Sequence, residues 1–516
     1  MSATESLFSS PRGTLYVLFV AAIGFAITQP AAAQTCAAST PPSVLTAQYG
    51  NLRQGYNSSE TTLTSTCLNN GTVTMKQPSW SPLMVDSGIG QANLIQAQPL
   101  YVSQITSTPA LTNCPNPCNM LVSVTLTGSV FAWNADTGAT IWSDCQRGTG
   151  CPNPTGNALW VEDCGQNGGV SLVQNGGTAG LPFAGIVSTP VIDLTTNPSQ
   201  PVLYATSLCE TSSSNGAQKW WIHQLNLYTG ADQIAPQQIG ASVSGSAAAD
   251  DLSGSSIPFN AWETLQRAAL LEVQFSGASH NPNPLVYVAF GFGYGLLGEK
   301  KTPYHGWVFA YDSSLTQQIR FVTTARGWGL GSNTDTPACT ANCTCTSGDP
   351  GTCNAGSGCI EKGYIFAENW CGHAGGVWMS GRGPAANPDS SLVASSAPWN
   401  YSGYFVNPIY DRHPLSSNVQ YPGGTLTVTS ASGNGALVWA LANVGASPGV
   451  GALYVYGANT LNLLYSSTAS GGYPAPSAFT NATFALPTVA NGYVYIPTAG
   501  ITSVSGSNYT CSRSAP

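Results

Sequence analysis

Charge is scarce in this sequence. Lys, Arg, Asp and Glu make up 7% of the 516 residues, against about 25% in an average soluble protein. The Lys and Arg residues, 14 in all, are scattered, and the longest basic run is Lys300-Lys301. Because nucleic-acid binding requires Lys and Arg clustered on one face, we expect no nucleic-acid partner. Hydrophobic residues still reach 42%, so the chain can bury a large core and is not a charged, disordered polymer.

Long apolar runs are also missing. The one near the start, Leu15–Ile27, is shorter than the roughly 20 residues that span a bilayer. Arg12 precedes it and Ala31-Ala32-Ala33 follows it, an order typical of a secretory signal peptide with its cleavage site. We therefore predict a signal peptide over residues 1–33 and no transmembrane segment after its removal, with an uncleaved anchor as the alternative. The protein would then be secreted, periplasmic or on the cell surface.

Several catalytic motifs are absent as well. The chain has only 5 His and contains no H-E-x-x-H zinc motif, no G-x-S-x-G nucleophile elbow and no P-loop. The Gly-rich stretch Gly291–Gly295 follows an expected strand, but no helix pattern follows it, so it is not a dinucleotide-binding fingerprint. Zinc-dependent hydrolysis, α/β-hydrolase chemistry and nucleotide binding of these kinds are not indicated.

Cysteine, in contrast, is plentiful at 15 residues. In an exported protein we expect disulfides. One short loop lies between Cys114 and Cys118, and a Cys-rich insertion covers residues 335–375 with the spacing C-x3-C-x-C-x7-C-x5-C. A zinc site is the alternative there, although paired C-x2-C units are missing. The odd count leaves at least one thiol without a partner in the chain.

A repeating unit runs through the sequence, which also holds 57 Gly and 35 Pro. Each copy begins with a short apolar strand, often led by Pro as in Gln98–Val102, and continues with alternating strands and turns such as Asn491-Gly492. Such a small sheet cannot bury its own face, and radial stacking solves this. We predict an all-β fold: a β-propeller of four-stranded antiparallel blades, six to eight in number with seven preferred. The N-terminal segment would pair with the C-terminal one, and an open β-sandwich array is the alternative.

The clearest copy ends in the sequence Ala132-Trp133-Asn134-Ala135-Asp136-Thr137-Gly138-Ala139-Thr140-Ile141-Trp142. Ala132, Thr137, Gly138 and Trp142 match the pattern A-x-D-x-x-T-G-x-x-x-W, and Asn134 replaces Asp. This segment resembles the tryptophan-docking motif of the quinoprotein propellers, which bind pyrroloquinoline quinone (PQQ). In that family the Thr-Gly turn and the Trp hold neighbouring blades together.

Longer stretches, among them Asn51–Gly55 and Gly375–Pro384, are similar to bacterial exported proteins with PQQ-like repeats. The resemblance implies a single PQQ-like propeller domain over residues 34–516. It also implies a site with an aromatic floor, Arg or Lys for the PQQ carboxylates, Ca²⁺ held by oxygen ligands and an Asp base. The adjacent Cys-Cys disulfide that often covers the cofactor in the dehydrogenases is absent here.

Four residues are candidates for such a site. Trp378 could stack on PQQ or pack between blades. Arg267 and Arg382 are rare charges in apolar segments, and each could hold an anion at the propeller axis or form a structural ion pair. His305 could serve as an acid or base, or be a hydrogen-bonded structural histidine.

Other carboxylates are weaker candidates. Glu263 could bind a metal or be a surface or paired carboxylate. The pairs Asp250-Asp251 and Glu162-Asp163 could bind Ca²⁺, but neither has the spacing of a calcium loop.

Two functions follow. We favour a non-catalytic binding or scaffold propeller, because the docking motifs are degraded and no base can be assigned. Its uncharged loops, rich in Ser, Thr, Asn and Tyr, suit a glycan or a surface protein as partner. The alternative is a PQQ- and Ca²⁺-dependent dehydrogenase of alcohols or sugars, an oxidoreductase that the family resemblance alone supports.

Overall fold

A computed structural model describes residues 42–65, 72–76, 95–145, 154–156, 159, 170–171, 183–210, 218–244, 256–262, 264–274, 284–292, 305–322, 343–345, 353–355, 359–361, 364–366, 383–386, 393–394, 424–431, 434–443, 450–467, 479–480, 485–497 and 508–512. The chain divides into Met1–Ala37 and Ala38–Pro516, and all described residues belong to the second unit. The predicted signal peptide therefore lies outside the described residues. No helix among the described residues is long and apolar enough to cross a membrane.

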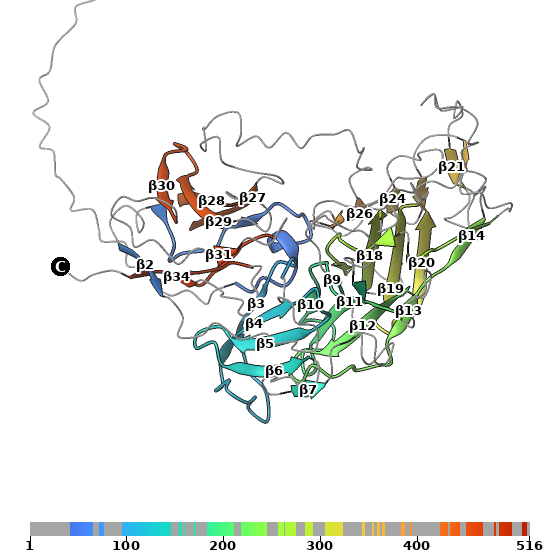
Figure 1. Ribbon diagram of the computed structural model, residues 1–516, viewed down its shortest axis with the longest axis horizontal. Helices are drawn as coiled ribbons and strands as arrows, with labels where there is room; N and C mark the ends of the chain where they lie inside the picture. The colour runs from blue at the N-terminus through green and yellow to red at the C-terminus, as the bar shows by residue number, and fades with distance from the viewer. Residues whose placement is uncertain are drawn as a thin grey trace, which may run out of the picture. The chain divides into compact units, whose positions relative to one another are not determined.

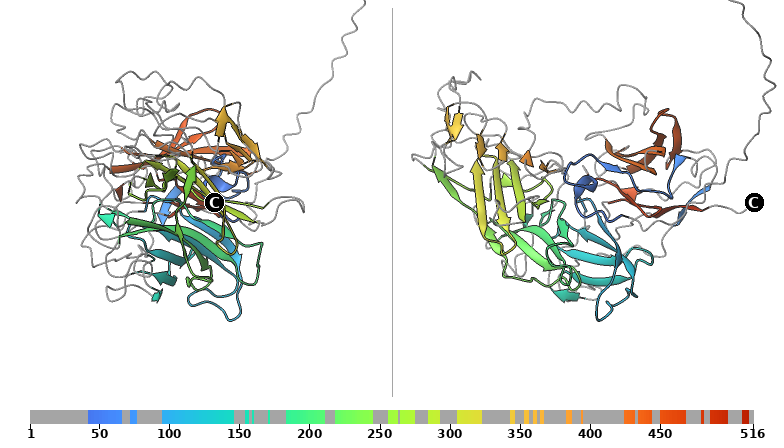
Figure 2. Two further views of the ribbon diagram at one scale, coloured as in Figure 1. Left: turned by 90° about the vertical axis from the view of Figure 1, so that its right-hand side faces the viewer. Right: turned by 180° about the vertical axis from the view of Figure 1, so that it is seen from behind.

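The described residues form small antiparallel sheets arranged as a β-propeller, as the repeats predict (Figures 1 and 2). Four sheets have four or more strands each. The first contains β3 (Leu100–Ile105), β4 (Cys118–Val124), β5 (Val130–Asn134), β6 (Thr140–Asp144) and β7 (Pro154–Gly156). The second contains β10 (Val191–Asp193), β11 (Val202–Glu210), β12 (Gln218–Asn226) and β13 (Gln237–Ile239). The third contains β16 (Thr264–Leu265), β17 (Leu271–Val273), β18 (Leu285–Phe292), β19 (Trp307–Asp312) and β20 (Gln317–Val322).

The fourth sheet contains β1 (Tyr56–Asn57), β27 (Gly424–Ala431), β28 (Asn434–Asn443), β29 (Val450–Gly457), β30 (Leu463–Ser466) and β31 (Phe479–Thr480). Shorter pairs join β25 (Ala385–Ala386) to β26 (Val393–Ala394), and β32 (Thr488–Ala490) to β33 (Tyr493–Tyr495). Further pairs are β8 (Val170–Ser171) with β9 (Phe183–Ala184) and β14 (Ser242–Ser244) with β15 (Ser256–Pro258). The total number of blades stays a prediction.

A strand from the N-terminal part of the described chain pairs antiparallel with the last described strand. Strand β2 (Thr72–Lys76) pairs with β34 (Asn508–Ser512), so that Thr72 is opposite Ser512. Strand β34 in turn contacts β33. The predicted pairing of an N-terminal segment with a C-terminal one is thereby confirmed. The turn between β32 and β33 is also as predicted, because Asn491 and Gly492 have φ of 53° and 77°, the conformation of a type I′ hairpin.

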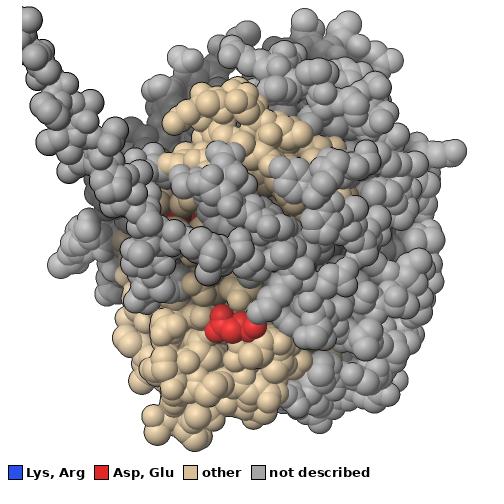
Figure 3. Space-filling model, turned by 90° about the vertical axis from the view of Figure 1, so that its left-hand side faces the viewer, with Lys and Arg blue, Asp and Glu red and all other residues tan. Residues whose placement is uncertain are grey.

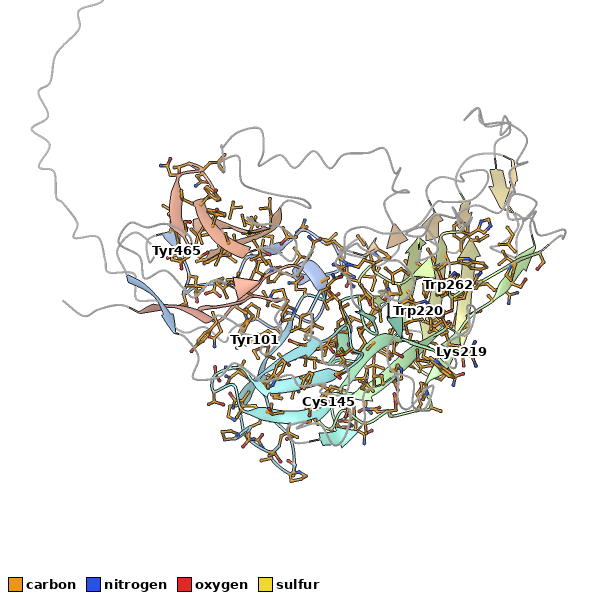
Figure 4. The ribbon with its side chains drawn as sticks, in the orientation of Figure 1. Tyr101, Cys145, Lys219, Trp220, Trp262 and Tyr465 are labelled. Carbon is orange, nitrogen blue, oxygen red and sulfur yellow. A yellow bond between two sulfur atoms is a disulfide. The ribbon has the colours of Figure 1, made fainter. Side chains whose placement is uncertain are left out.

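Central strands are buried on both faces because the sheets pack against one another. All six residues of β19 are buried, whereas burial alternates over the first part of the edge strand β20. Trp220 of the second sheet lies edge-on to Phe290 of the third, with ring centroids 5.6 Å apart (Figure 4). The core therefore lies between the sheets, as a propeller requires.

The docking tryptophan joins the first two sheets. Trp142 Nε1 donates a hydrogen bond to Leu227 O at 2.9 Å. Gly230, in the Thr-Gly turn of the second sheet, has φ of 81°, and a Cβ added there would lie 2.6 Å from Cε3 of Trp142. Only glycine allows both this conformation and this close contact. The motif thus has the blade-locking contact that the family resemblance implies.

Disulfides are present in the loops. Cys114 and Cys118 are bonded to each other, and Cys145 and Cys209 are also disulfide-bonded. The Cys-rich insertion contains two hairpins, one formed by β21 (Cys343–Cys345) and β22 (Cys353–Ala355), the other by β23 (Cys359–Glu361) and β24 (Tyr364–Phe366). Cys345 is opposite Cys353 in the register of the first hairpin.

Candidate functional site

The segments that lead into the first strand of successive sheets meet one another. Gln98 N donates to Thr189 Oγ1 at 2.9 Å, and Leu270 N donates to Thr189 O at 3.0 Å. Thr488 Oγ1 donates to Pro99 O at 2.6 Å. In a propeller these strands surround the central channel. The meeting point is therefore the axial region in which the family resemblance implies a cofactor.

Arg267, one of the four predicted site residues, lies in this region and is 1% exposed. Its Nη1 donates to Val187 O at 3.0 Å and its Nη2 to Gln96 O at 3.5 Å. Burial lowers the pKa of Arg267 to about 10. Arg267 lies between two strands of the third sheet. Its guanidinium thus links the segment that leads into the first sheet to the segment that leads into the second. Its proposed role as an anion ligand stays a prediction.

One stretch of chain, Ser43–Glu60, contacts the first strand of sheet after sheet. We call it the axial segment. It includes the 3₁₀ turn η1 (Ala47–Tyr49) and strand β1. Its hydrogen-bonded partners follow chain order: β3 through Val44 and Tyr101, β10 through Leu45 and Ile192, β17 through Asn51 and Glu272, β25 through Asn51 and Ala386, β27 through Gly55 and Val428, and β32 through Asn57 and Val489.

These contacts are mostly main-chain hydrogen bonds. Ile192 N donates to Leu45 O at 2.8 Å, and Val428 N donates to Gly55 O at 2.7 Å. Such bonds require main-chain N–H and C=O groups at the edges of the first strands that are not paired within their own sheets. The axial segment therefore lies against the innermost strands and is hydrogen-bonded to their main-chain groups.

A second arginine, Arg53, anchors the axial segment. Its guanidinium donates to Pro384 O at 2.8 Å, to Leu270 O at 2.6 Å and to Ala47 O at 2.8 Å, and also to the hydroxyl of Thr46. Burial lowers the pKa of Arg53 to about 9. The sequence analysis did not single out Arg53 as a site residue, although an Arg in so charge-poor a chain was a usable signal.

Glu60 fixes the end of the axial segment. Its carboxylate accepts hydrogen bonds from the main-chain N–H groups of Thr62 at 2.9 Å, Leu63 at 3.0 Å and Gly492 at 3.2 Å. Burial raises the pKa of Glu60, and these three hydrogen bonds act in the opposite direction. The carboxylate thus ties the segment to the turn between β32 and β33.

The other predicted site residues are placed as follows. His305 is buried just before β19, and its role as an acid or base stays a prediction. Trp378 and Arg382 lie outside the described residues, as do Glu263, Asp250-Asp251 and Glu162-Asp163. Of the four main candidates, the described residues therefore place only Arg267 and His305.

The second sheet contains a Ser-His-Asp arrangement. His223 Nε2 is 3.0 Å from Ser207 Oγ, and His223 Nδ1 is 3.3 Å from Asp232 Oδ1. Ser207 and His223 are both 0% exposed, so no substrate can reach the hydroxyl. The arrangement resembles a hydrolase triad in its partners, but its burial makes it a structural hydrogen-bond network. No motif could have indicated this network, because the three residues lie on different strands and turns.

A site for PQQ and Ca²⁺ needs several charged or oxygen-bearing side chains close together. Among the described residues, no group of three or more His, Cys, Asp or Glu side chains comes together. The axial arginine that the structure describes in detail, Arg267, donates to main-chain carbonyls, and the axial segment contributes Arg53 in the same manner. Within the described residues these hydrogen bonds go to protein groups, and the binding of PQQ and Ca²⁺ stays a prediction.

Comparisons with known proteins were also made. No protein-family model and no curated protein matches the sequence. The similar solved structures include the quinohemoprotein alcohol dehydrogenase from Comamonas testosteroni, at 13% identity and a TM-score of 0.31, covering 89% of this chain and 57% of that one. They also include BamB from Moraxella catarrhalis, at 13% identity and a TM-score of 0.20, covering 73% of this chain and 78% of that one. This chain spans little more than half of the dehydrogenase, and TM-scores this low support no conclusion about activity.

Proposed function

We propose that this protein is an exported, non-catalytic β-propeller of the PQQ-like repeat type that binds or scaffolds a partner. The observation that carries the proposal is the axial segment, which is hydrogen-bonded to the first strands of successive sheets. Arg53 and Arg267 support it, because both guanidinium groups donate to main-chain carbonyls.

The composition of the chain supports a neutral partner, because charged residues make up only 7% of it. On the face drawn in Figure 3, the only charged residues in view among the coloured ones are acidic. Uncharged polar loops bind through hydrogen bonds and aromatic contacts rather than ion pairs. We therefore propose a glycan or a surface protein as the partner. The disulfides at Cys114, Cys118, Cys145 and Cys209 support a secreted, periplasmic or cell-surface location, because such bonds persist in oxidising compartments.

The test is a titration of the purified protein with PQQ in the presence of Ca²⁺, followed by tryptophan fluorescence, with Ca²⁺ alone as the control. We expect no saturable quenching beyond the control. Saturable quenching by micromolar PQQ would overturn the proposal and favour the PQQ- and Ca²⁺-dependent alcohol or sugar dehydrogenase. An array of neutral glycans then tests the partner class, and binding to acidic glycans alone would contradict it.

A further inference from the structure

Two carboxylates from neighbouring sheets come together near the ends of their first strands. Asp193 is the last residue of β10, and Glu272 lies in β17, two strands that contact each other. Their side chains are linked through two others. Thr195 Oγ1 donates to Asp193 Oδ1 at 2.8 Å, and Gln274 Nε2 donates both to Thr195 Oγ1 and to Glu272 Oε1, the latter at 3.1 Å. Asp193, Thr195, Glu272 and Gln274 thus form one cluster, which we call the carboxylate pair.

One oxygen of this cluster has no partner. Asp193 is 2% exposed. Its Oδ1 accepts hydrogen bonds from Thr195 N at 2.7 Å and Thr196 N at 3.0 Å, whereas its Oδ2 is buried without a hydrogen-bond partner among the described residues. A buried carboxylate oxygen in this situation lacks the hydrogen bonds that water would give it, and this is unfavourable. Native proteins leave few such atoms, and an unseen ion is one of the usual reasons.

The charges around the pair point the same way. Burial and then the negative charge of Asp193 raise the pKa of Glu272 to about 8. Burial pushes the pKa of Asp193 up, but hydrogen bonds from Thr196 and Thr195 outweigh it and hold the pKa below its usual value. Tyr204 faces the same cluster, and its pKa is raised by burial and then by Asp193, Glu272 and Asp312. No cation among the described residues forms an ion pair with either carboxylate.

We propose that Asp193 and Glu272 form a binding site for a divalent cation of the calcium type, between the first strands of two neighbouring sheets. Carboxylate oxygens are the ligands of hard cations, and Ca²⁺ tolerates irregular geometry completed by water. Asp193 offers Oδ2, and Glu272 offers the oxygen that Gln274 leaves free. Water can complete the ligand set because Thr195 and Gln274 are exposed. The cation would hold the second and third sheets together.

This site adjoins the axial segment, because Asn51 Nδ2 donates to the main-chain oxygen of Glu272 at 2.8 Å, but it uses the carboxylate of Glu272, which takes no part in that hydrogen bond. Arg267 precedes β17, and Glu272 lies inside it. The inference needs neither PQQ nor a catalytic role, and its failure would leave the proposed function untouched.

The experiment measures Ca²⁺ binding to the purified, chelator-treated protein by titration calorimetry and by thermal unfolding at pH 8. We expect saturable binding and a rise in Tm of about 2–3 °C at 100 times the Kd. In Asp193→Asn and in Glu272→Gln, the Kd for Ca²⁺ should rise at least about tenfold. A tenfold change in Kd corresponds to about 1.4 kcal/mol, which is the size expected for the loss of one charged ligand. Mg²⁺ at the same concentration tests the selectivity for the larger ion.

Asp312→Asn is the matched control. Asp312 also ends a strand and accepts hydrogen bonds from the following turn, but its Oδ2 accepts one from Gln318 at 2.7 Å. This variant should lose some stability and keep the Ca²⁺ response. If wild-type protein shows no saturable response, or if both site variants keep it, the proposal is wrong. If Tm falls as pH rises from 5 to 8 both with and without Ca²⁺, the two carboxylates share a proton instead of a cation. That result would also overturn the proposal.

Discussion

Replacing Gly230 by alanine tests the contact between the first two sheets. Gly230 has φ of 81°, and the added Cβ would lie 2.6 Å from Trp142 Cε3 and 2.6 Å from Asp144 Oδ2. The left-handed conformation costs an L-residue about 1–2 kcal/mol. The overpacking adds about 1–3 kcal/mol, since neither neighbour is the end of a flexible chain in open space. We therefore expect Gly230→Ala to lower stability by about 2–5 kcal/mol, which is a fall in Tm of about 2–5 °C for a domain of this size.

The assay is thermal unfolding followed by near-ultraviolet circular dichroism. Gly240→Ala is the control, because nothing lies within 4 Å of the Cβ that it would add, and it should stay within about 0.5 kcal/mol of the parent. Trp142→Phe removes the hydrogen bond to Leu227 O and the ring atoms that meet Gly230. In that background Gly230→Ala should cost less, with a coupling of about 0.5–3 kcal/mol. Equal effects of Gly230→Ala and Gly240→Ala, or no coupling with Trp142→Phe, would refute the docking contact.

Three further predictions follow from other contacts. Arg267→Met should lower the free energy of unfolding by about 2–4 kcal/mol, because two buried carbonyls lose a charged donor. The control is Arg320→Met in the edge strand β20, where Arg320 is exposed, and it should have no measurable effect. Thermal unfolding of both variants measures the difference. Without added metal, the free energy of unfolding should fall as pH rises from 4.5 to about 8, because Glu272 in the folded protein keeps a proton that it has released in the unfolded chain. Urea titrations at several pH values measure this slope, and Glu272→Gln should flatten it. Replacing Cys114 and Cys118 together by alanine should lower stability by about 2 kcal/mol through the lost loop constraint, and an unchanged urea midpoint would contradict this.

Local patterns in the sequence were sufficient to predict much of the fold. Alternating burial and turn residues located the strands, and Asn491-Gly492 specified its hairpin because both positions need positive φ. Trp142 was recognisable from its motif. The pairing of an N-terminal segment with a C-terminal one was also predicted, since a ring of sheets must close, but the sequence did not identify β2 and β34 as the two strands.

Contacts between residues far apart in the sequence could not be predicted in the same way. The axial segment makes most of its contacts with the strands through main-chain groups, which leave no trace in residue identity, and its partners run from Tyr101 to Val489. Asp193 and Glu272 belong to different sheets, so only the packing of those sheets brings them together. Sequence analysis did identify Arg267 as unusual, because a charge in an apolar segment requires a partner. It could not indicate that the described partners are carbonyls.

Hydrogen–deuterium exchange of the axial segment, with and without PQQ plus Ca²⁺, tests the central claim most directly. The N–H groups of Val44, Gln48 and Gly55 are hydrogen-bonded to Tyr101 O, Gln98 Oε1 and Gln48 O. We predict that peptides covering these residues exchange as slowly as those from β10 and β27, and that PQQ leaves their exchange unchanged. Fast exchange of the segment in the free protein, slowed when PQQ is added, would contradict the account and show that the axial region is available to a cofactor.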